Sequence, residues 1–423
     1  MPKILMVAFH FPPMTGSSGQ MRTVSFANTL TELGWEVHVL TASAIAHVRL
    51  SENTDVSPDV RVHTAFALDA ARHLSVAGRY PAWFEVPDRW WTWAVPGILK
   101  GLQIVRRNRP DVIWATYPIA TAQLIGLGIA KLSGLPLVAD FRDPMTEDNY
   151  PKERARKRAC VWIEANVLAR AKRIVFTSPG TLAMYRERYR VQSSDKLRLV
   201  ENGYDGRVFQ LAKEKAKHAV VSRNRVILVH SGALYPKERD PRAFFQALAQ
   251  LQSDHKGFQD VEIVLRGTGH DSLYAAMLAS LGIERLVRLE PSLPHTDAVA
   301  ELLSADGLLL FQSRSCNHQT PAKIYEYLKS GKPILALTDS AGDTAEKLRE
   351  YPAAVMAPLD DAGAISDGLS RFLAIVRDAG RANSSALATD DRDSRHARGV
   401  LLQSLLQELL RNQTSRSSYT EQT

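Results

Sequence analysis

Short apolar runs alternate with longer amphipathic stretches along the whole chain. In the first half, six apolar runs have the length of buried strands: 4–9, 36–41, 111–116, 135–141, 173–178 and 197–200. The same rhythm restarts further on with 226–230, 261–266, 287–290, 307–311, 333–338 and 353–356. Strands separated by helical segments are typical of parallel sheets with crossover helices. We therefore predict an α/β protein of two Rossmann-like, doubly wound parallel-sheet domains that face a cleft.

A charged stretch with few apolar residues, 213–218, separates the two series of predicted strands. We place an N-terminal domain at 1–205 and a C-terminal domain at 206–394, and a chain of 423 residues allows each domain its own core. Segment 397–410 carries leucines at helical spacing, which predicts a helix that packs on another element. The polar residues 412–423 are predicted to be disordered.

Composition narrows the class of protein. Hydrophobic residues at 45% and charged residues at 23% are typical of a globular protein. Only Cys160 and Cys316 occur, far apart, which gives no disulfide framework and no metal-type spacing and suits a reducing cytosol. The most apolar long stretch, 119–139, is interrupted by polar residues and proline, so we predict no transmembrane helix and a cytoplasmic protein. A net charge of +8 fits nucleic acid, an anionic membrane face or phosphorylated substrates without choosing among them.

The most informative segment is 318–333, because it reads as a helix with an open N-terminal end. Thr320 can cap the first turn with its hydroxyl, and Pro321 lacks an amide at a position that needs none. Free amides and the positive end of the helix dipole would attract a diphosphate there. Lys323 lies in this first turn, and Glu326, one turn deeper, could accept both hydroxyls of a ribose. The segment thus predicts a nucleotide-diphosphate site, with an ordinary capped helix as the alternative.

Two loops that follow predicted strands in the first half carry further candidate chemistry. The small residues of 10–20 let backbone amides approach a ligand, but neither the P-loop ending nor the GxGxxG fingerprint is present, which argues against kinases and dehydrogenases. In 140–144, Asp140 and Asp143 flank Arg142 at a strand end. These charges form either a structural ion pair or a site for catalysis or acceptor binding.

In the second half, the loop 231–241 brings basic side chains toward the helix that follows. Lys237, Arg239 and Arg242 could hold phosphate oxygens, and a solvated charged turn is the alternative for each. The glycines of 266–269 predict a tight turn beside a nucleobase.

Segment 81–93 concentrates four of the seven tryptophans: Trp83, Trp90, Trp91 and Trp93. Basic residues follow it at Lys100, Arg106, Arg107 and Arg109. Aromatic and basic residues together are typical of a membrane interface, and tryptophans packed beneath a loop are the equal alternative.

Together these segments resemble the retaining glycosyltransferases of GT-B fold, most closely family 4 and its bacterial polysaccharide-assembly members. The matching segments occur in family order: Phe11-Pro12-Pro13 with Gly16 and Arg22, 109–113, 140–143, 201–205, 231–242 and 323–333. The resemblance implies transfer of a sugar, with retention, from a nucleotide-diphosphate sugar in the C-terminal domain to an acceptor held mainly by the N-terminal domain. It implies no cofactor and no metal, and it implies that helix 397–410 returns to the N-terminal domain.

The resemblance also assigns residues. Glu326 would bind the donor ribose, Lys323 and Arg239 would lie near the diphosphate, and Asp143 would lie beside the reacting sugar and acceptor. Two positions depart from the family pattern: His318 replaces the first glutamate of E-x7-E, which usually touches the donor sugar, and Ala233 replaces a frequent arginine. Lys237 or Arg239 must then supply that charge. The predicted donor site as a whole comprises Gly16, Gly232, Lys237, Arg239, His318, Thr320, Lys323 and Glu326.

The expected partners are a nucleotide-sugar donor and a sugar or lipid-linked sugar acceptor in cell-surface polysaccharide or glycolipid synthesis, with peripheral contact at the inner membrane face. Two other functions fit the same residues. A nucleotide-sugar epimerase could use the same fold and donor site, and a non-catalytic nucleotide-sugar-binding scaffold is made more credible by His318. Nucleic-acid binding is not expected, because the basic residues are dispersed rather than aligned on one element.

Overall fold

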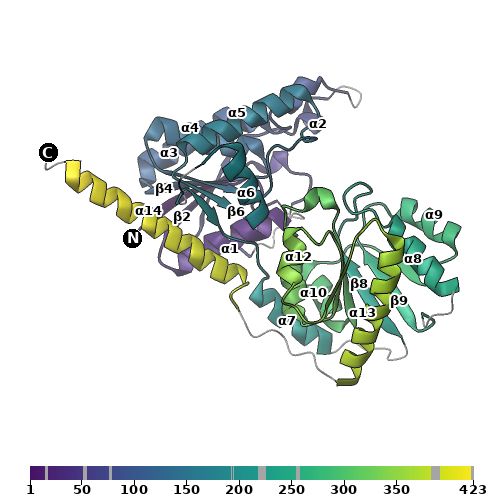
Figure 1. Cartoon of the computed structure of the whole chain (residues 1–423). Coiled ribbons are helices and arrows are strands. Elements are labelled where there is room, and N and C mark those ends of the chain that lie inside the picture. The colour runs from purple at the N-terminus through teal and green to yellow at the C-terminus, as the bar shows by residue number, and fades with distance from the viewer. Residues whose placement is uncertain are drawn as a thin grey trace. The chain divides into compact units, whose positions relative to one another are not determined.

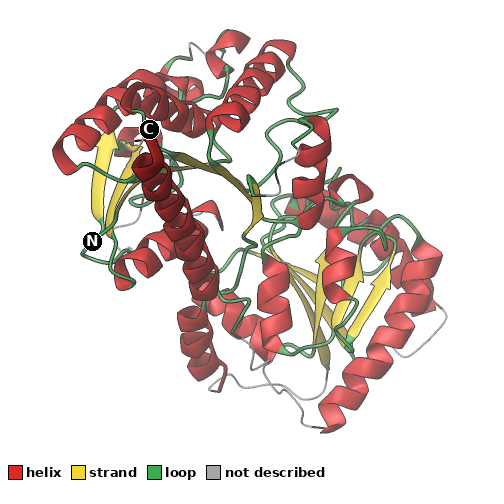
Figure 2. Cartoon of the chain, turned by 60° about the vertical axis from the view of Figure 1, so that its left-hand side comes forward, coloured by secondary structure: helices red, strands yellow, loops and turns green. Residues whose placement is uncertain are grey.

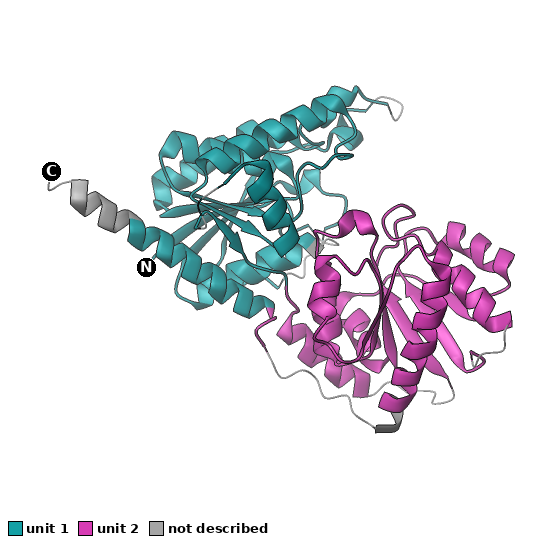
Figure 3. Ribbon diagram, viewed as in Figure 1, with its two compact units in different colours: residues 1–202, 395–423 teal, residues 203–394 magenta. Residues whose placement is uncertain are grey.

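The structure of the protein is a computed structural model whose helices and strands are labelled in Figure 1. It describes residues 1–14, 18–50, 55–75, 79–191, 193, 195–217, 225–253, 258–382 and 391–420. Figure 2 shows the strands gathered into two separate sheets with helices around each. The chain divides into two compact units, unit 1 with residues 1–202 and 395–423 and unit 2 with residues 203–394 (Figure 3).

Unit 1 is built on a parallel sheet. Its described strands number seven, in the order β3-β2-β1-β4-β5-β6-β7. Their bounds are β1 Lys3–Val7, β2 Glu36–Ala42, β3 Arg61–Ala65, β4 Val112–Thr116, β5 Leu137–Phe141, β6 Arg173–Phe176 and β7 Leu197–Leu199. The strand order reverses between β1 and β4, the position at which open parallel sheets bind ligands beyond the strand ends. Strand β3 was not predicted, because Arg61, His63 and Thr64 interrupt its apolar pattern at the sheet edge.

Helices cover both faces of this sheet (Figure 1). Apolar side chains of α3, α4, α5 and α6 join one core cluster, and those of α1 and α14 join the cluster on the other face. The bounds are α1 Ser18–Glu32, α2 Ala70–His73, α3 Ala94–Asn108, α4 Ala120–Ser133, α5 Arg154–Arg170, α6 Pro179–Arg188 and α14 Arg395–Thr420. Helices α3 and α4 approach closely because glycine faces isoleucine: a Cβ on Gly97 would lie 2.6 Å from Cδ1 of Ile125.

Helix α14 returns to unit 1, as the resemblance implies. Its leucines Leu402, Leu405, Leu406 and Leu409 are buried in the cluster that α1 shares. Gly399 allows the two helices to approach, since a Cβ there would lie 2.7 Å from Cβ of Thr29. Helix α14 spans Arg395–Thr420, so it is longer than the predicted helix 397–410.

The predicted disordered tail starts at 412, but α14 continues to Thr420, and no glycine or proline interrupts 411–420. The last residues, 421–423, lie outside the described ones.

The tryptophan-rich segment folds onto the core of unit 1. Trp93 is fully buried and Trp90 is half-buried, so the packing interpretation is confirmed for these two residues. Asp88, also buried, accepts a hydrogen bond from the backbone N of Thr121 at 2.7 Å and thereby caps α4. Trp83, on the short 3-10 helix η2 (Ala82–Glu85), is 63% exposed.

Unit 2 repeats the architecture. In the part of unit 2 that is described, six parallel strands run in the order β10-β9-β8-β11-β12-β13. Their bounds are β8 Val226–Ser231, β9 Val261–Arg266, β10 Val287–Glu290, β11 Gly307–Phe311, β12 Ile334–Leu337 and β13 Ala354–Ala357. The order reverses between β8 and β11, so the loops after these two strands occupy the position that favours ligand binding. The prediction of two doubly wound parallel sheets is confirmed.

Helices also cover both faces of the second sheet. One core cluster includes residues of α8, α9 and α13, and the other includes residues of α7, α10, α11 and α12. The bounds are α7 Gly206–Lys217, α8 Arg242–Ser253, α9 Asp271–Leu281, α10 His295–Ser304, α11 Lys323–Ser330, α12 Asp343–Leu348 and α13 Ala362–Ala382.

The boundary between the units lies after Asn202, whereas 205 was predicted. Tyr204 explains the difference, because it is buried in unit 2 and its backbone N donates to Asp393 O at 3.1 Å. No helix of the described residues is both long enough and apolar enough to cross a membrane.

Candidate active site

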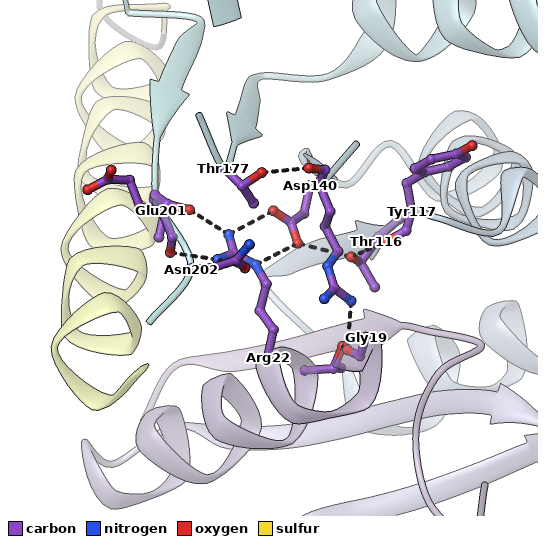
Figure 4. Close-up of polar contacts among 12 residues, drawn as sticks. Gly19, Arg22, Thr116, Tyr117, Asp140, Thr177, Glu201 and Asn202 are labelled. Atoms are coloured by element: carbon purple, nitrogen blue, oxygen red, sulfur yellow. Dashed lines mark hydrogen bonds and ion pairs between the residues drawn. The ribbon is translucent and has the colours of Figure 1, made fainter. Parts of the chain in front are cut away.

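A buried ion pair lies at the carboxyl end of β5 in unit 1. Asp140 has no exposed surface, and Arg22, from α1, is 3% exposed. The guanidinium binds both carboxylate oxygens, with Nη2 3.0 Å from Oδ1 and Nε 3.3 Å from Oδ2 (Figure 4). This is the bidentate geometry in which arginine and carboxylate interact most strongly.

The other hydrogen bonds of Arg22 and Asp140 are also made to groups of unit 1. Arg22 also donates to Val200 O and Glu201 O, each at 2.8 Å, and Thr116 Oγ1 donates to Asp140 Oδ2 at 2.9 Å (Figure 4). These contacts connect α1 with β4, β5 and the segment that follows β7. Asp140 therefore forms the structural ion pair, but its partner is Arg22 rather than the neighbouring Arg142.

Arg142 is directed to the start of α1. Its Nη1 donates to Gly19 O at 2.6 Å, and Thr177 Oγ1 donates to the Arg142 carbonyl at 2.5 Å. Burial, reinforced by the positive charge of Arg22, lowers the pKa of Arg142 to about 10. Arg142 thus fixes the first turn of α1, immediately after the loop that contains Gly16. Gly16 itself lies outside the described residues.

Asp143, the predicted catalytic residue, is exposed at the end of β5. Burial, followed by the charges of Tyr150 and Asp143, raises the pKa of Tyr117 well above its usual value, so Asp143 and Tyr117 are near each other. His10, which the sequence analysis did not single out, lies at the end of β1. Burial and the positive charge of Arg142 lower the pKa of His10 to about 4, so this imidazole is neutral at pH 7. The loops after β1, β4 and β5 therefore place polar groups at the switch point of unit 1.

In unit 2, Lys323 reaches from the start of α11 to the end of β8. Its Nζ donates to Ser231 O at 2.7 Å and lies 3.4 Å from Nε2 of His230. Gly232 has a φ of +117°, and a Cβ on it would come within 3.0 Å of the Lys323 Nζ. Glycine is needed there for its left-handed backbone and for the space that the ammonium occupies.

The charges around Lys323 leave it short of negative partners. Burial, followed by the positive charge of Arg239, lowers the pKa of Lys323 to about 7, and Glu326 only partly opposes this effect. The fully buried His230 lies between the carbonyls of Leu309 and Gly232, at 2.9 and 3.1 Å. Burial and the charge of Lys323 lower the pKa of His230 well below its usual value, so it is neutral at pH 7. An anion bound here would be attracted to a cationic group that lacks a carboxylate of its own.

The two basic residues of the β8–α8 loop lie in different surroundings. Arg239 is half-buried, donates from Nη1 to Ala233 O at 3.0 Å and lies 5.4 Å from the Tyr235 ring centroid. Lys237 is exposed and lines a pocket of about 600 Å³ together with residues such as Gln312. That lining does not include Lys323 or Glu326. Arg239 is therefore the loop cation whose charge acts on Lys323.

Glu326 has a partner that the sequence analysis missed. His295 begins α10, and its Nε2 lies 2.8 Å from Glu326 Oε1. Glu326 is half-buried, one turn beyond Lys323 on α11. A ribose hydroxyl at Glu326 would therefore bind to a carboxylate that His295 already orients.

The start of α11 differs from the prediction. Thr320 was expected to cap it, but the N-cap is Ala322, which provides no side-chain cap, and the helix begins at Lys323. The helix begins later than predicted because a tight turn precedes it, in which Ile324 N donates to Pro321 O at 3.1 Å. Thr320 is buried, and His318 is half-buried with its Nε2 3.4 Å from Nε2 of Gln319.

Within the described ranges, no three His, Cys, Asp or Glu side chains are grouped in a way that could hold a metal ion. The groups that the structure does bring together are Gly232, Arg239, Lys323 and Glu326, around the ends of β8 and α11. Their geometry favours an anionic ligand that also carries hydroxyls.

Comparisons with known proteins agree with this architecture. Residues 19–207 match the family described as Glycosyltransferase Family 4, and residues 225–374 match Glycosyl transferases group 1. No curated protein sequence gave a significant match.

Several solved structures share the fold at low sequence identity. Sucrose-phosphate synthase from Thermosynechococcus elongatus is 14% identical with a TM-score of 0.68, over 97% of this chain and 100% of that one. HepE from Anabaena, solved with UDP and glucose, is 14% identical with a TM-score of 0.65, over 96% and 100%. WaaG, a glycosyltransferase involved in lipopolysaccharide biosynthesis, is 13% identical with a TM-score of 0.58, over 94% and 99%. With both of its units matched to glycosyltransferase families, the chain belongs to the GT-B glycosyltransferases, as a family 4 domain followed by a group 1 domain.

Proposed function

We propose that the protein transfers a sugar, with retention of anomeric configuration, from a nucleoside-diphosphate sugar to a hydroxyl of a saccharide or lipid-linked saccharide. The observation that carries the proposal is the cluster at the β8–β11 switch point, where Lys323 donates to Ser231 O, Arg239 donates to Ala233 O and neither cation forms an ion pair with a described carboxylate. A diphosphate provides the negative charge that this cluster lacks. Support comes also from HepE, which shares the fold and was solved with UDP and glucose.

Each residue of unit 2 has a proposed role. The diphosphate accepts hydrogen bonds from Lys323 and Arg239 and from backbone amides near Gly232. The ribose hydroxyls donate to Glu326, whose orientation is set by His295. Thr320 and His318 are proposed to lie toward the sugar in this arrangement, and His318 supplies an imidazole where a glutamate is common in the family.

Chemistry follows from the same charges. The bond between the anomeric carbon and the β-phosphate oxygen breaks, and negative charge grows on the departing nucleoside diphosphate. Lys323 and Arg239 stabilise that charge, which lowers the barrier because the interaction strengthens in the transition state. The acceptor hydroxyl forms the new bond to the anomeric carbon on the face that the diphosphate leaves, and its proton passes to the departing diphosphate oxygen. Asp143 is proposed to bind the sugar or the acceptor from unit 1.

The acceptor is proposed to belong to cell-surface polysaccharide or glycolipid synthesis at the cytoplasmic face of the membrane. WaaG, which shares the fold, is involved in lipopolysaccharide biosynthesis and supports this pathway class. Cys160 and Cys316, both free thiols, support a reducing compartment.

Calorimetric titration with UDP, GDP and a panel of their sugars tests the donor site first. We expect one nucleotide to bind selectively and its sugar to be transferred to a saccharide acceptor, with nucleoside diphosphate released and activity unchanged by EDTA. NMR of the product would show the donor's anomeric configuration retained. Inverted product would contradict retention, and interconversion of the sugar nucleotide without acceptor would identify an epimerase. Selective binding without either reaction would identify a scaffold.

A further inference from the structure

A fully buried imidazole, that of His230 at the end of β8, lies beside the donor cluster. Its ring packs edge-to-face with Phe311 on β11, with ring centroids 5.0 Å apart and planes at 88°. Its nitrogens contact two backbone carbonyls, Nδ1 that of Leu309 on β11 and Nε2 that of Gly232 in the loop after β8. The ring therefore has a fixed place between the two strands that form the switch point of unit 2.

The ammonium of Lys323 lies on the Nε2 side of this ring. An ammonium has three N–H donors and no acceptor. One donor is directed to Ser231 O at 2.7 Å, and Nε2 of His230, at 3.4 Å, is a second, longer contact. Gly232 closes another side, since a Cβ there would come within 3.0 Å of Nζ. Among the described residues no further acceptor contacts Nζ, so one N–H remains for a ligand.

The surroundings of the ring decide which nitrogen carries its proton. The imidazole is neutral, because burial and the charge of Lys323 lower the pKa of His230, and it therefore has a single N–H. On Nδ1, this N–H donates to Leu309 O at 2.9 Å, and the Nε2 lone pair faces the ammonium.

The other tautomer fits the same neighbours less well. With the proton on Nε2, the N–H would donate to Gly232 O at 3.1 Å, but it would also point toward a cation. The Nδ1 lone pair would then face the carbonyl oxygen of Leu309 at the shorter distance. Because hydrogen bonds to charged groups are the stronger ones, the geometry favours the proton on Nδ1 and a lone pair for Lys323.

A neutral acceptor suits this position better than a charged one. A carboxylate in place of His230 would form an ion pair with Lys323 and would compete with an incoming anion. The imidazole orients the ammonium through a lone pair and leaves its positive charge in place. A purely structural role accounts for only half of the ring, because a bridge from β8 to Leu309 O needs the Nδ1 donor alone.

We propose that His230 is a positioning residue for sugar transfer: its Nδ1–H anchors the ring on β11, and its Nε2 holds the Lys323 ammonium toward the donor diphosphate. His230 acts through Lys323 and touches no substrate itself. Holding Lys323 in one orientation before the donor arrives reduces the side-chain entropy that binding would otherwise lose. The inference rests on the proposed function, since it takes Lys323 as a ligand of the diphosphate.

A double-mutant cycle on the full chain, titrated with UDP and GDP by calorimetry, tests this role. His230→Asn keeps a donor near the place of Nδ1 and removes the Nε2 acceptor, so it should weaken binding of the preferred nucleotide about fivefold. In a Lys323→Met background, His230→Asn should cause no further loss, because the side chain that it orients is gone. His230→Gln, whose longer amide can present an oxygen where Nε2 lies, should recover most of the affinity.

Tyr327→Phe is the matched control. The Tyr327 hydroxyl donates to the same Leu309 O at 3.2 Å, and none of the hydrogen bonds among the described residues joins it to Lys323. This variant should leave nucleotide affinity unchanged. The proposal would be overturned by an equal loss from Tyr327→Phe, or by a loss from His230→Asn that persists without Lys323. Either result would mean that the bridge between the strands matters and the contact with the ammonium does not.

The tautomer can be measured with the ring in place. In protein labelled with nitrogen-15 histidine, long-range nitrogen–proton spectra should show His230 protonated at Nδ1 alone, and Lys323→Met should shift that resonance, which identifies it. Protonation at Nε2 would overturn the proposal even if the His230 variants failed to fold. Wild type that binds neither nucleotide would overturn the proposed function, whereas wild-type affinity that His230→Asn leaves intact would overturn the role of His230 alone.

Discussion

Both units place charged groups at the carboxyl ends of parallel strands, and they use these groups in opposite ways. In unit 1, the carboxylate of Asp140 is satisfied by Arg22 and Thr116, and Arg22 is satisfied by carbonyls. In unit 2, Lys323 donates to Ser231 O and lies near the neutral His230, Arg239 donates to Ala233 O, and the charge of Arg239 acts on Lys323. Both clusters follow parallel strands near a switch point, so topology alone does not tell them apart.

The difference supports the proposal that the strand end of unit 2, and not that of unit 1, binds a ligand. A buried charge that is paired and fully hydrogen-bonded stabilises the fold and has little left for a ligand. A cation that burial disfavours and that lacks a carboxylate gains from binding an anion. Perturbed pKa values mark the second kind, since the pKa of Lys323 falls to about 7.

The largest expected effect comes from breaking the unit 1 pair. Arg22→Ala leaves the buried Asp140 carboxylate unpaired and should destabilise unit 1 by about 3–5 kcal/mol. All seven tryptophans lie in unit 1, so their fluorescence during urea unfolding reports this unit alone. Asp143→Asn, at an exposed neighbouring position, is the control and should leave the midpoint unchanged. An unaltered midpoint for Arg22→Ala would show that the pair is not a structural element.

The second prediction concerns the unit 2 cluster. Lys323→Met should weaken binding of the preferred nucleoside diphosphate by about 2–3 kcal/mol, because a charged hydrogen bond to the diphosphate is lost. Lys237→Met is the matched control, since this lysine lines a different pocket. Calorimetry on both variants compares them directly. If Lys237→Met caused the larger loss, the diphosphate would lie in that pocket and not at Lys323.

Glu326 allows a similar test one turn away. Glu326→Ala should weaken nucleotide binding by roughly 1–3 kcal/mol through the loss of charge-assisted bonds to the ribose. Wild type should bind the nucleotide more tightly than its 2′-deoxy analogue, and the variant should not distinguish them. His295→Ala should cost less, because the carboxylate remains. Undiminished discrimination in a folded Glu326→Ala protein would remove the ribose assignment.

The smallest effect is a dependence on pH. In the free protein the pKa of Lys323 is lowered to about 7, whereas a bound diphosphate favours the charged ammonium and raises it. Binding above pH 7 therefore takes up a proton, and affinity should fall about tenfold for each pH unit above 7. Calorimetry at pH 8 in buffers of different ionisation enthalpy measures this uptake, which Lys323→Met should abolish. If the Lys323→Met protein still took up a proton on binding the nucleotide, that proton would belong to another group.

The same pKa fixes the sign of a stability change. An unfolded lysine titrates near 10.5, so between about pH 7 and 10.5 the unfolded chain binds more protons at Lys323 than the folded one. This residue therefore contributes a destabilisation that is complete below pH 7 and is lost as pH rises toward 10.5.

Much of the fold could be predicted from the sequence. Short continuous apolar runs identified the buried strands, since a strand covered on both faces must be apolar throughout. Strand β3 escaped because an edge strand tolerates Arg61 and His63. The glycosyltransferase resemblance was also confirmed, because the residues around Lys323, Glu326 and Gly331 lie within one short segment and need no distant partner to be recognised.

The partners of charged groups depended on the tertiary structure. Asp140 pairs with Arg22, 118 positions away, rather than with Arg142, and Glu326 pairs with His295. No local pattern encodes such pairs, because they form only where the packing of helices on strands brings distant segments together. The position at which α11 begins also depended on the tertiary structure, because a tight turn at Pro321 places the first helical residue at Lys323 rather than next to Thr320.

The sequence by itself determined two parallel-sheet domains, a basic chain and a segment that we expect to bind phosphate, since periodicity, charge and helix-end chemistry are local properties. Only the tertiary structure decided which charges neutralise one another and which are left for a ligand. It buried Trp93, exposed Trp162 and paired Glu164, the acidic residue of α5, with Arg188. The physical reason is that burial and pairing depend on neighbours in space, and neighbours in space are fixed by packing rather than by spacing along the chain.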